Sequence, residues 1–198
     1  MANYMKNHFA FLGIKKPERN GLMRQFFKES GILQKPFSQN FVSELWEKEE
    51  REYQYAAMDY MERSLKKLNK DDIPFLEILI TTKSWWDSVD ILAPKLVGKI
   101  ALESPEIIEQ TIDRWSVSEN IWLTRSAILF QLKYKEQSNE ELLYRYIIEN
   151  SESNEFFIQK AMGWALREYS KSNPESVKNF ISTHTLPKLT VREGSKYV

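Results

Sequence analysis

Four residues of this chain are best suited to chemistry: two tryptophans, one carboxylate and one guanidinium. Trp86 and Asp90 lie four residues apart, so their side chains are neighbours wherever this segment is helical. Arg125 follows Asp90 by 35 residues, and Trp164 lies in a further tryptophan-bearing segment. An aromatic wall and a carboxylate on one helix would face the same ligand. The residues therefore predict an anionic and aromatic pocket, and on their own they do not name its substrate.

A sequence repeat would place these side chains at matching points of neighbouring helix pairs. A small residue recurs in similar helical segments at Ala57, Ala127 and Ala161, at intervals of 70 and 34 residues. Because 70 is two steps of 35, a further repeat is expected near residue 92, and Asp90 and Arg125 then occupy equivalent positions. A period of this size, built from helix pairs, is typical of a HEAT-like α-solenoid. The sequence thus predicts an all-α, C-shaped array whose second helices line one concave face.

The expected helices cover most of the chain, and no segment is long enough to separate two domains. Ser104-Pro105 and Asn173-Pro174 are typical of capped helix starts. The few glycines and prolines and the lack of alternating apolar residues argue against strands. We predict one domain over 1–198, with helices at 1–10, 17–29, 38–48, 50–68, 72–81, 84–101, 104–115, 119–135, 138–150, 154–171 and 173–183.

The composition excludes several classes of protein and site. The absence of cysteine excludes disulfides and cysteine metal sites, and it fits a reducing cytoplasm. Nothing resembles a secretory leader, and no apolar run approaches the roughly 18 residues of a membrane span, so we expect a cytoplasmic protein. His8 and His184 lie near opposite ends of the chain, so a metal site is not expected. We also expect no cofactor.

The net charge is zero, but the charges are unevenly distributed. Residues 1–28 hold six basic residues and one acidic residue, and residues 155–198 hold seven basic and four acidic ones. The middle of the chain therefore carries a charge of −8. Basic ends on a curved solenoid could grip a polyanion such as DNA. Runs of charge are also often only solvated surface, so this feature alone does not decide between the two interpretations.

Each of the selected residues also has a purely structural interpretation. Tryptophans in helical repeats most often pack in the core, which we expect for Trp46 and Trp115. Trp85 and Trp86 point about 100° apart on a helix, so one should be buried and the other exposed. Asp90 could be solvated or could pair with an arginine of the next repeat, and Arg125 could be that structural partner without taking part in chemistry.

Three long motifs are SWWDSVD at 84–90, NIWLTRSAILFQLKYK at 120–135 and FFIQKAMGWALREY at 156–169, and two shorter ones near the N-terminus are NYMKN at 3–7 and FLGI at 11–14. The three long motifs resemble the AlkD-type DNA alkylation repair family, and the two shorter ones resemble its N-terminal region. The resemblance spans nearly the whole chain, with the motifs in the family's order. It implies a HEAT-like repeat glycosylase that removes cationic alkylpurines, such as 3-methyladenine and 7-methylguanine, from duplex DNA without turning the base into a deep pocket.

The resemblance also implies roles for individual residues. Asp90 would stabilise the sugar cation and position the attacking water, while Trp86 and Trp164 would pack against the sugar and backbone of the lesion. Arg125 would support the site and hold a nearby phosphate. The partner would be duplex DNA, bound by a monomer that associates with the bacterial nucleoid. The DNA-binding residues would be Tyr4, Lys6, Lys15, Lys133, Lys135, Lys160 and Arg167.

The family usually extends beyond both ends of the matched segment, so a shortened chain is expected, and a missing N-terminal helix would affect DNA affinity.

Two alternatives from other classes remain open at this point. A non-catalytic DNA-binding paralogue would bind duplex DNA without releasing a base. A protein-interaction scaffold, the commonest use of such arrays, would show no salt-dependent DNA binding.

Overall fold

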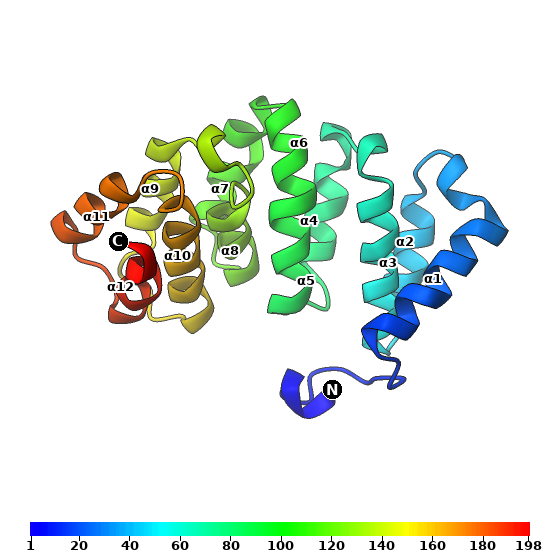
Figure 1. The fold of residues 1–198 in the computed structure, drawn as a ribbon. Coiled ribbons are helices and arrows are strands. Elements are labelled where there is room, and N and C mark those ends of the chain that lie inside the picture. Colours follow the sequence, from blue (N-terminus) through cyan, green and yellow to red (C-terminus); the bar gives the residue numbers. More distant parts are fainter. The chain divides into compact units, whose positions relative to one another are not determined.

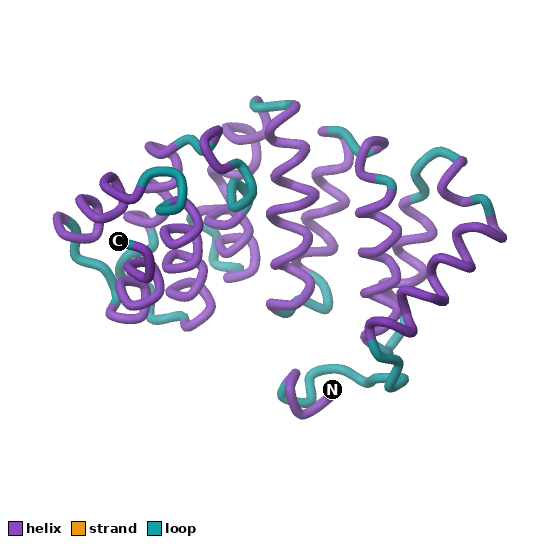
Figure 2. Tube along the Cα trace, viewed as in Figure 1, coloured by secondary structure: helices purple, strands orange, loops and turns teal.

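The computed structural model describes residues 1–198, which form helices and connecting loops without a β-strand (Figure 2). The helices fall into two compact units, unit 1 at Met1–Phe75 and unit 2 at Leu76–Val198, and the boundary lies inside helix α4, Ile73–Thr81. The predicted all-α class and the solenoid-type stacking of helix pairs are confirmed, whereas the single domain stays a prediction. No helix has both the length and the apolar character that a bilayer crossing requires.

Unit 1 contains three α-helices, which are α1 at Lys16–Ser30, α2 at Gln39–Glu47 and α3 at Arg51–Arg63. The Ser38 hydroxyl caps α2 by accepting the Phe41 N–H at 3.2 Å. The buried Gln54 amide of α3 donates to the carbonyls of Trp46 and Lys48 at 3.0 and 2.8 Å. These bonds satisfy the carbonyls that the end of α2 leaves without a helical partner.

The helix predicted at 1–10 is wrong, because the chain there forms one 3-10 turn, Ala2–Met5, and then runs extended. Lys6 and Asn7 have φ of 50° and 59°, which ends the turn. The Glu52 carboxylate of α3 accepts the N–H groups of Leu12, Gly13 and Ile14 at 3.0 to 3.1 Å. A distant carboxylate thus supplies the hydrogen bonds that a local helix would otherwise make.

Unit 2 continues with helix pairs (Figure 1). A long second helix comprises α5 at Trp86–Ile91, the π-helical segment η5 at Leu92–Val97 and α6 at Gly98–Glu103. The next pair is the π-helical η6 at Ile108–Ile112 running into α7 at Asp113–Ser116, followed by α8 at Ile121–Leu129. The remaining helices are α9 at Glu140–Glu149, α10 at Phe156–Tyr169, α11 at Pro174–Thr183 and α12 at Lys188–Gly194.

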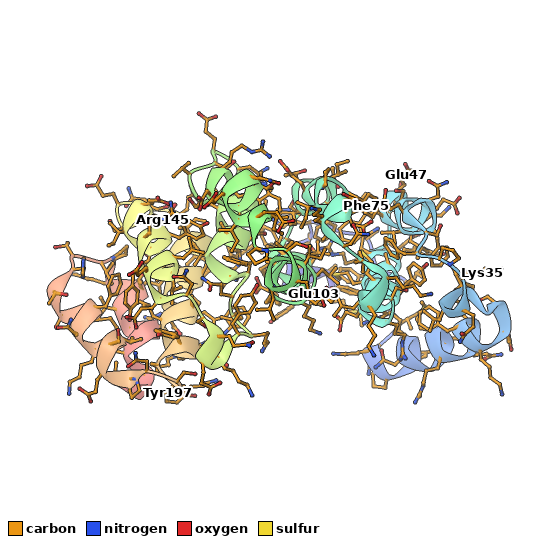
Figure 3. All side chains as sticks on the ribbon, turned by 90° about the horizontal axis from the view of Figure 1, so that it is seen from above. Lys35, Glu47, Phe75, Glu103, Arg145 and Tyr197 are labelled. Carbon is orange, nitrogen blue, oxygen red and sulfur yellow. The ribbon has the colours of Figure 1, made fainter.

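Within unit 2 the helices form two layers. One layer contains α7, α9 and α11, joined by bonds such as Tyr146 Oη to the Asp113 carboxylate and Tyr144 Oη with Ser176 Oγ at 2.9 Å. In the other layer, α8 packs on α5 and α10, and α10 packs on α12. From above, Arg145 on α9 and Tyr197 just after α12 lie at opposite faces of this unit (Figure 3).

The residues that define the repeat are buried. Ala57, Ala127 and Ala161 are at most 1% exposed, and Leu92, at the predicted missing repeat, is fully buried. Trp46 and Trp115 are buried in the core, which confirms their structural interpretation. Small or apolar residues therefore recur at these positions because the positions are buried where the helices pack together.

The predicted helix at 119–135 ends early, at Leu129. The Gln131 side chain accepts the Asn139 N–H at 2.7 Å and donates to its carbonyl at 3.3 Å. Gly98 allows the close approach of this turn, because a Cβ there would lie 2.2 Å from the Phe130 carbonyl oxygen. Tertiary contacts thus replace the last helical turns.

Candidate functional site

Asp90 and Arg125 form a two-pronged ion pair between neighbouring second helices. Arg125 Nε donates to Asp90 Oδ1 at 2.8 Å, and Nη2 donates to Oδ2 at 2.9 Å. Asp90 lies on α5 and Arg125 on α8, at the equivalent repeat positions predicted from their spacing. The parallel geometry fixes the plane of the carboxylate as well as its position.

Arg125 also connects this pair to a third helix. Its Nη1 donates to the Phe157 carbonyl in the first turn of α10. The guanidinium thus uses three of its five N–H groups inside the protein, and the side chain is only 5% exposed. Arg125 therefore acts foremost as a clamp on the carboxylate, and this arrangement leaves two N–H groups for any other acceptor.

Asp90 is a carboxylate held largely out of water. Its side chain is 17% exposed. Burial raises its pKa above the ordinary value of 3.8, against the opposing hydrogen bonds and charge of Arg125. Each oxygen offers about two lone pairs and accepts one hydrogen bond from Arg125, so each retains a second lone pair. Such a group can stabilise a cation that forms next to it.

An aromatic cluster made by Trp85, Trp122 and Phe157 adjoins the ion pair through Phe157. The ring of Phe157 lies 5.1 Å from Trp85 and 5.0 Å from Trp122, and the two tryptophans are 5.7 Å apart, all measured between ring centroids. The Arg125 Cζ lies 6.0 Å from the Phe157 ring centroid. Phe157 therefore links the aromatic cluster to the Arg125 side of the ion pair.

We did not predict this aromatic cluster from the sequence, although the spacing of its three residues indicates it. Phe157 follows Trp122 by 35 residues, and Trp122 follows Trp85 by 37, close to the repeat step. The prediction that one of Trp85 and Trp86 is buried and the other exposed is wrong, because both are half-buried. Trp85 is the N-cap of α5 and not a helical residue, so the expected 100° separation does not apply.

Trp86 and Trp164 both lie on second helices. Trp86 is the first residue of α5, one turn before Asp90, and is half-buried. Trp164 is half-buried on α10, between Lys160 and Arg167. The predicted neighbours Trp86 and Asp90 thus share a face of one helix.

Pro94 explains why the helix that carries Asp90 is irregular. It follows Asp90 by four residues and has no N–H, so it cannot make the ordinary α-helical bond to the Asp90 carbonyl. The helix widens there into the π-helical segment Leu92–Val97, and Gly98 N–H bonds to the Ala93 carbonyl, five residues back. Such π segments are frequent at functional sites.

The predicted DNA-binding residues differ in their surroundings. Tyr4, Lys6 and Lys15 are exposed in unit 1. Lys133 and Lys135 are exposed just after α8. Lys160 and Arg167 are instead bound to a residue that the sequence did not single out, the buried Glu193 of α12, at 3.0 and 2.7 Å. The spacing of 33 residues from Lys160 to Glu193 again approximates the repeat step.

Comparison with known proteins places this geometry among DNA repair proteins. The family model described as "DNA alkylation repair enzyme" matches residues 1–198. A solved structure described as a predicted DNA alkylation repair enzyme from Enterococcus faecalis is similar with a TM-score of 0.91 and 37% sequence identity. The match covers 100% of this chain and 92% of that one. No curated protein matches the sequence.

Proposed function

The chain belongs to the DNA alkylation repair enzyme family, and from this we propose that it is a DNA glycosylase that removes cationic alkylpurines from duplex DNA. Its substrates would include 3-methyladenine and 7-methylguanine. The observation that carries the proposal is the half-buried Asp90 carboxylate, clamped by Arg125 next to the aromatic cluster. A fixed, poorly solvated carboxylate is suited to a reaction in which positive charge develops on the substrate.

The proposed reaction breaks the bond between the alkylpurine and C1′ of the deoxyribose. The purine is already cationic, so it leaves as a neutral base when it takes the electron pair of that bond. Water adds to C1′ and loses a proton, which leaves an abasic sugar. Positive charge passes from the base to the sugar in the transition state, and little acid catalysis is needed.

Asp90 would face that sugar cation. Fixed electrostatic stabilisation of this kind contributes roughly 3 to 4 kcal/mol in enzyme sites. The carboxylate would also orient the attacking water and accept its proton. Arg125 would act mainly by holding Asp90, because both of its prongs are engaged there.

The two predicted tryptophans would bind the lesion nucleotide from the sides. Trp86, one turn before Asp90, and Trp164 on α10 would pack against its sugar and backbone. Aromatic faces favour a neighbouring cation by roughly 0.5 to 2 kcal/mol. The lesion would stay at an open surface, and no deep base pocket is required. Exposed cations on the predicted DNA-binding segments would contact phosphates of the duplex.

Release of 7-methylguanine from a duplex tests the proposal directly. We expect the wild type to release the base in single-turnover assays, and Asp90→Asn to lose most excision while retaining its fold and its affinity for damaged DNA. The amide keeps the shape and removes the charge, so the effect belongs to turnover and not to binding. A wild-type rate for Asp90→Asn overturns the mechanism. Duplex binding without base release by either protein identifies a non-catalytic DNA binder.

A further inference from the structure

Glu193 lies at the centre of a group of basic side chains in unit 2. Its carboxylate is contacted by Lys160 Nζ at 3.0 Å, Arg167 Nη1 at 2.7 Å, Lys196 Nζ at 2.7 Å and Arg192 Nη2 at 3.6 Å. We call these four basic residues and Glu193 the Glu193 cluster. The Glu193 side chain is 8% exposed, whereas every cation is more exposed than the carboxylate. The charged groups therefore converge on one buried anion and extend toward solvent.

The close contact of α10 with α12 makes this arrangement possible (Figure 1). A Cβ on Gly163 would lie 2.6 Å from Glu193 Cβ and 2.9 Å from the Thr190 carbonyl oxygen. Only a glycine lets the two backbones approach this closely. Thr190 Oγ1 then donates to the Gln159 carbonyl at 3.1 Å, which fixes α12 against the first half of α10. These contacts hold Glu193 against the part of α10 that carries Lys160.

The cluster is next to the predicted lesion-binding surface. Lys160, Trp164 and Arg167 follow one another at steps of four and three residues on α10, so they share one face of that helix. Lys160 also follows Arg125 by 35 residues, which makes it the counterpart of Arg125 in the next repeat. The Lys160–Glu193 pair therefore resembles the Asp90–Arg125 pair. The acidic residue comes first along the chain in the Asp90–Arg125 pair, and the basic residue comes first in the Lys160–Glu193 pair.

One carboxylate cannot use all the donors around it. The three closest cations, Lys160, Arg167 and Lys196, offer eleven N–H groups in total, against about four lone-pair directions on the carboxylate. Hydrogen bonds from Lys196 and Lys160 lower the pKa of Glu193 from 4.5 to about 2, so the group is ionised at neutral pH. With Arg192 included, four positive charges oppose one negative charge. The cluster keeps a net charge of +3 and retains N–H groups that the carboxylate does not accept.

We propose that Glu193 is a positioning residue and that the Glu193 cluster binds a backbone phosphate of duplex DNA on the Trp164 side of α10. This inference rests on the proposed function, since it assigns a phosphate-binding site to the same DNA surface. A free lysine or arginine loses considerable side-chain entropy when it binds a phosphate. Glu193 holds the cations in place beforehand, so less entropy is lost on binding.

The sign of one substitution separates positioning from simple charge masking. Glu193→Gln removes a negative charge, so an electrostatic count predicts tighter binding of DNA. If Glu193 positions the cations, the same substitution weakens binding. The probe is an undamaged duplex, and the dissociation constant is measured over a series of salt concentrations. We expect weaker binding for Glu193→Gln and a salt slope that is smaller by about 1 for each phosphate that the variant no longer neutralises. Equal or tighter binding overturns the inference.

A second pair of variants gives an answer even where Glu193→Gln fails to fold. Lys196→Gln removes one exposed cation of the cluster, and Lys178→Gln makes the same change on an exposed position of α11. Thermal unfolding checks that both variants remain folded. We expect Lys196→Gln to reduce affinity and to lower the salt slope by about 1, with a smaller effect of Lys178→Gln. Equal effects of the two variants overturn the inference.

Base release measured on the same preparations separates this inference from the proposed function. If the wild type excises 7-methylguanine and Glu193→Gln binds DNA as tightly as the wild type, the phosphate-binding role of the Glu193 cluster is wrong and the proposed glycosylase activity stands. A wild type without excision, whose variants bind DNA as expected here, supports the cluster and overturns the glycosylase. A wild type that does not bind duplex DNA at all overturns both.

Discussion

Pro94 lies one helical turn after Asp90 and cannot donate to the Asp90 carbonyl. The helix responds with the π-helical segment Leu92–Val97, which begins two residues after the carboxylate. In a regular α-helix each residue is rotated by about 100° about the helix axis relative to the residue before it, and a π-helical segment changes this rotation. The direction in which the later residues of this helix pack, relative to Asp90, therefore depends on the proline.

Pro94→Ala should reduce excision while the protein remains folded. Alanine restores the N–H and favours a regular α-helix, which would change the phase between Asp90 and the buried residues that follow it. A displacement of about 1 Å at a reacting centre can reduce the rate by up to about 100-fold. Single-turnover release of 7-methylguanine, together with circular dichroism, measures the effect.

Pro174→Ala is the matched control, because Pro174 is the first residue of α11. A proline at that position removes no helical bond. We expect this variant to excise at the wild-type rate. An unchanged rate for Pro94→Ala as well would show that the π segment does not position the carboxylate.

Arg125→Met should destabilise the protein more than removal of an exposed arginine does. It leaves the half-buried Asp90 carboxylate without its counter-ion, which costs about 3 kcal/mol in comparable buried pairs. Arg145→Met breaks an exposed pair with Asp113, and such pairs contribute at most about 1 kcal/mol. Urea unfolding measures both variants.

The double variant Asp90→Asn, Arg125→Met provides a further check on the ion pair. Residues in direct contact give non-additive effects on the free energy of unfolding. We expect the double variant to be destabilised by less than the sum of the two single variants. Additive effects would mean that the pair contributes little to the folded state.

The helices and the repeat step could be predicted because both depend on local patterns. Apolar periodicity and capped starts marked most helices within a few residues, and the alanines at 57, 127 and 161 marked the packing positions. The same step predicted that Asp90 and Arg125 are equivalent, and the structure shows them in direct contact. In a repeat, residues separated by one repeat length lie next to each other in space. A single sequence was therefore enough to predict that Asp90 and Arg125 are neighbours.

The features that escaped prediction depend on distant residues or on backbone detail. The chain around Gly13 is not helical because Glu52, 39 residues away, takes its N–H group. Trp85 is a cap and not a helical residue, so its direction did not follow from periodicity. Glu193 has no distinctive local motif, and its importance appears only when the cations of α10 are seen around it.

Trp164→Ala should weaken both DNA binding and excision. The half-buried indole would no longer pack on the lesion backbone, and burial of one large aromatic side chain contributes roughly 1.5 to 3 kcal/mol. We expect at least about a tenfold rise in the dissociation constant for damaged duplex. Trp164→Phe keeps an aromatic face and should show a smaller effect. A normal dissociation constant for the alanine variant would remove Trp164 from the proposed binding surface.

Excision should decline on acidification because the proposed mechanism needs ionised Asp90. Burial raises the pKa of this carboxyl above 3.8, so protonation begins at a higher pH than for a solvated aspartate. The active species is the charged form, and the rate should therefore rise with pH through that pKa and then level off. Single-turnover rates across an acidic pH series, at pH values where the fold is intact by circular dichroism, measure this limb. Asp90→Asn has no carboxyl to titrate, so its residual excision should not show the same limb. If the variant and the wild type lose excision in parallel, the titrating group is not Asp90, and the proposed role of this carboxylate in opposing the sugar cation is wrong.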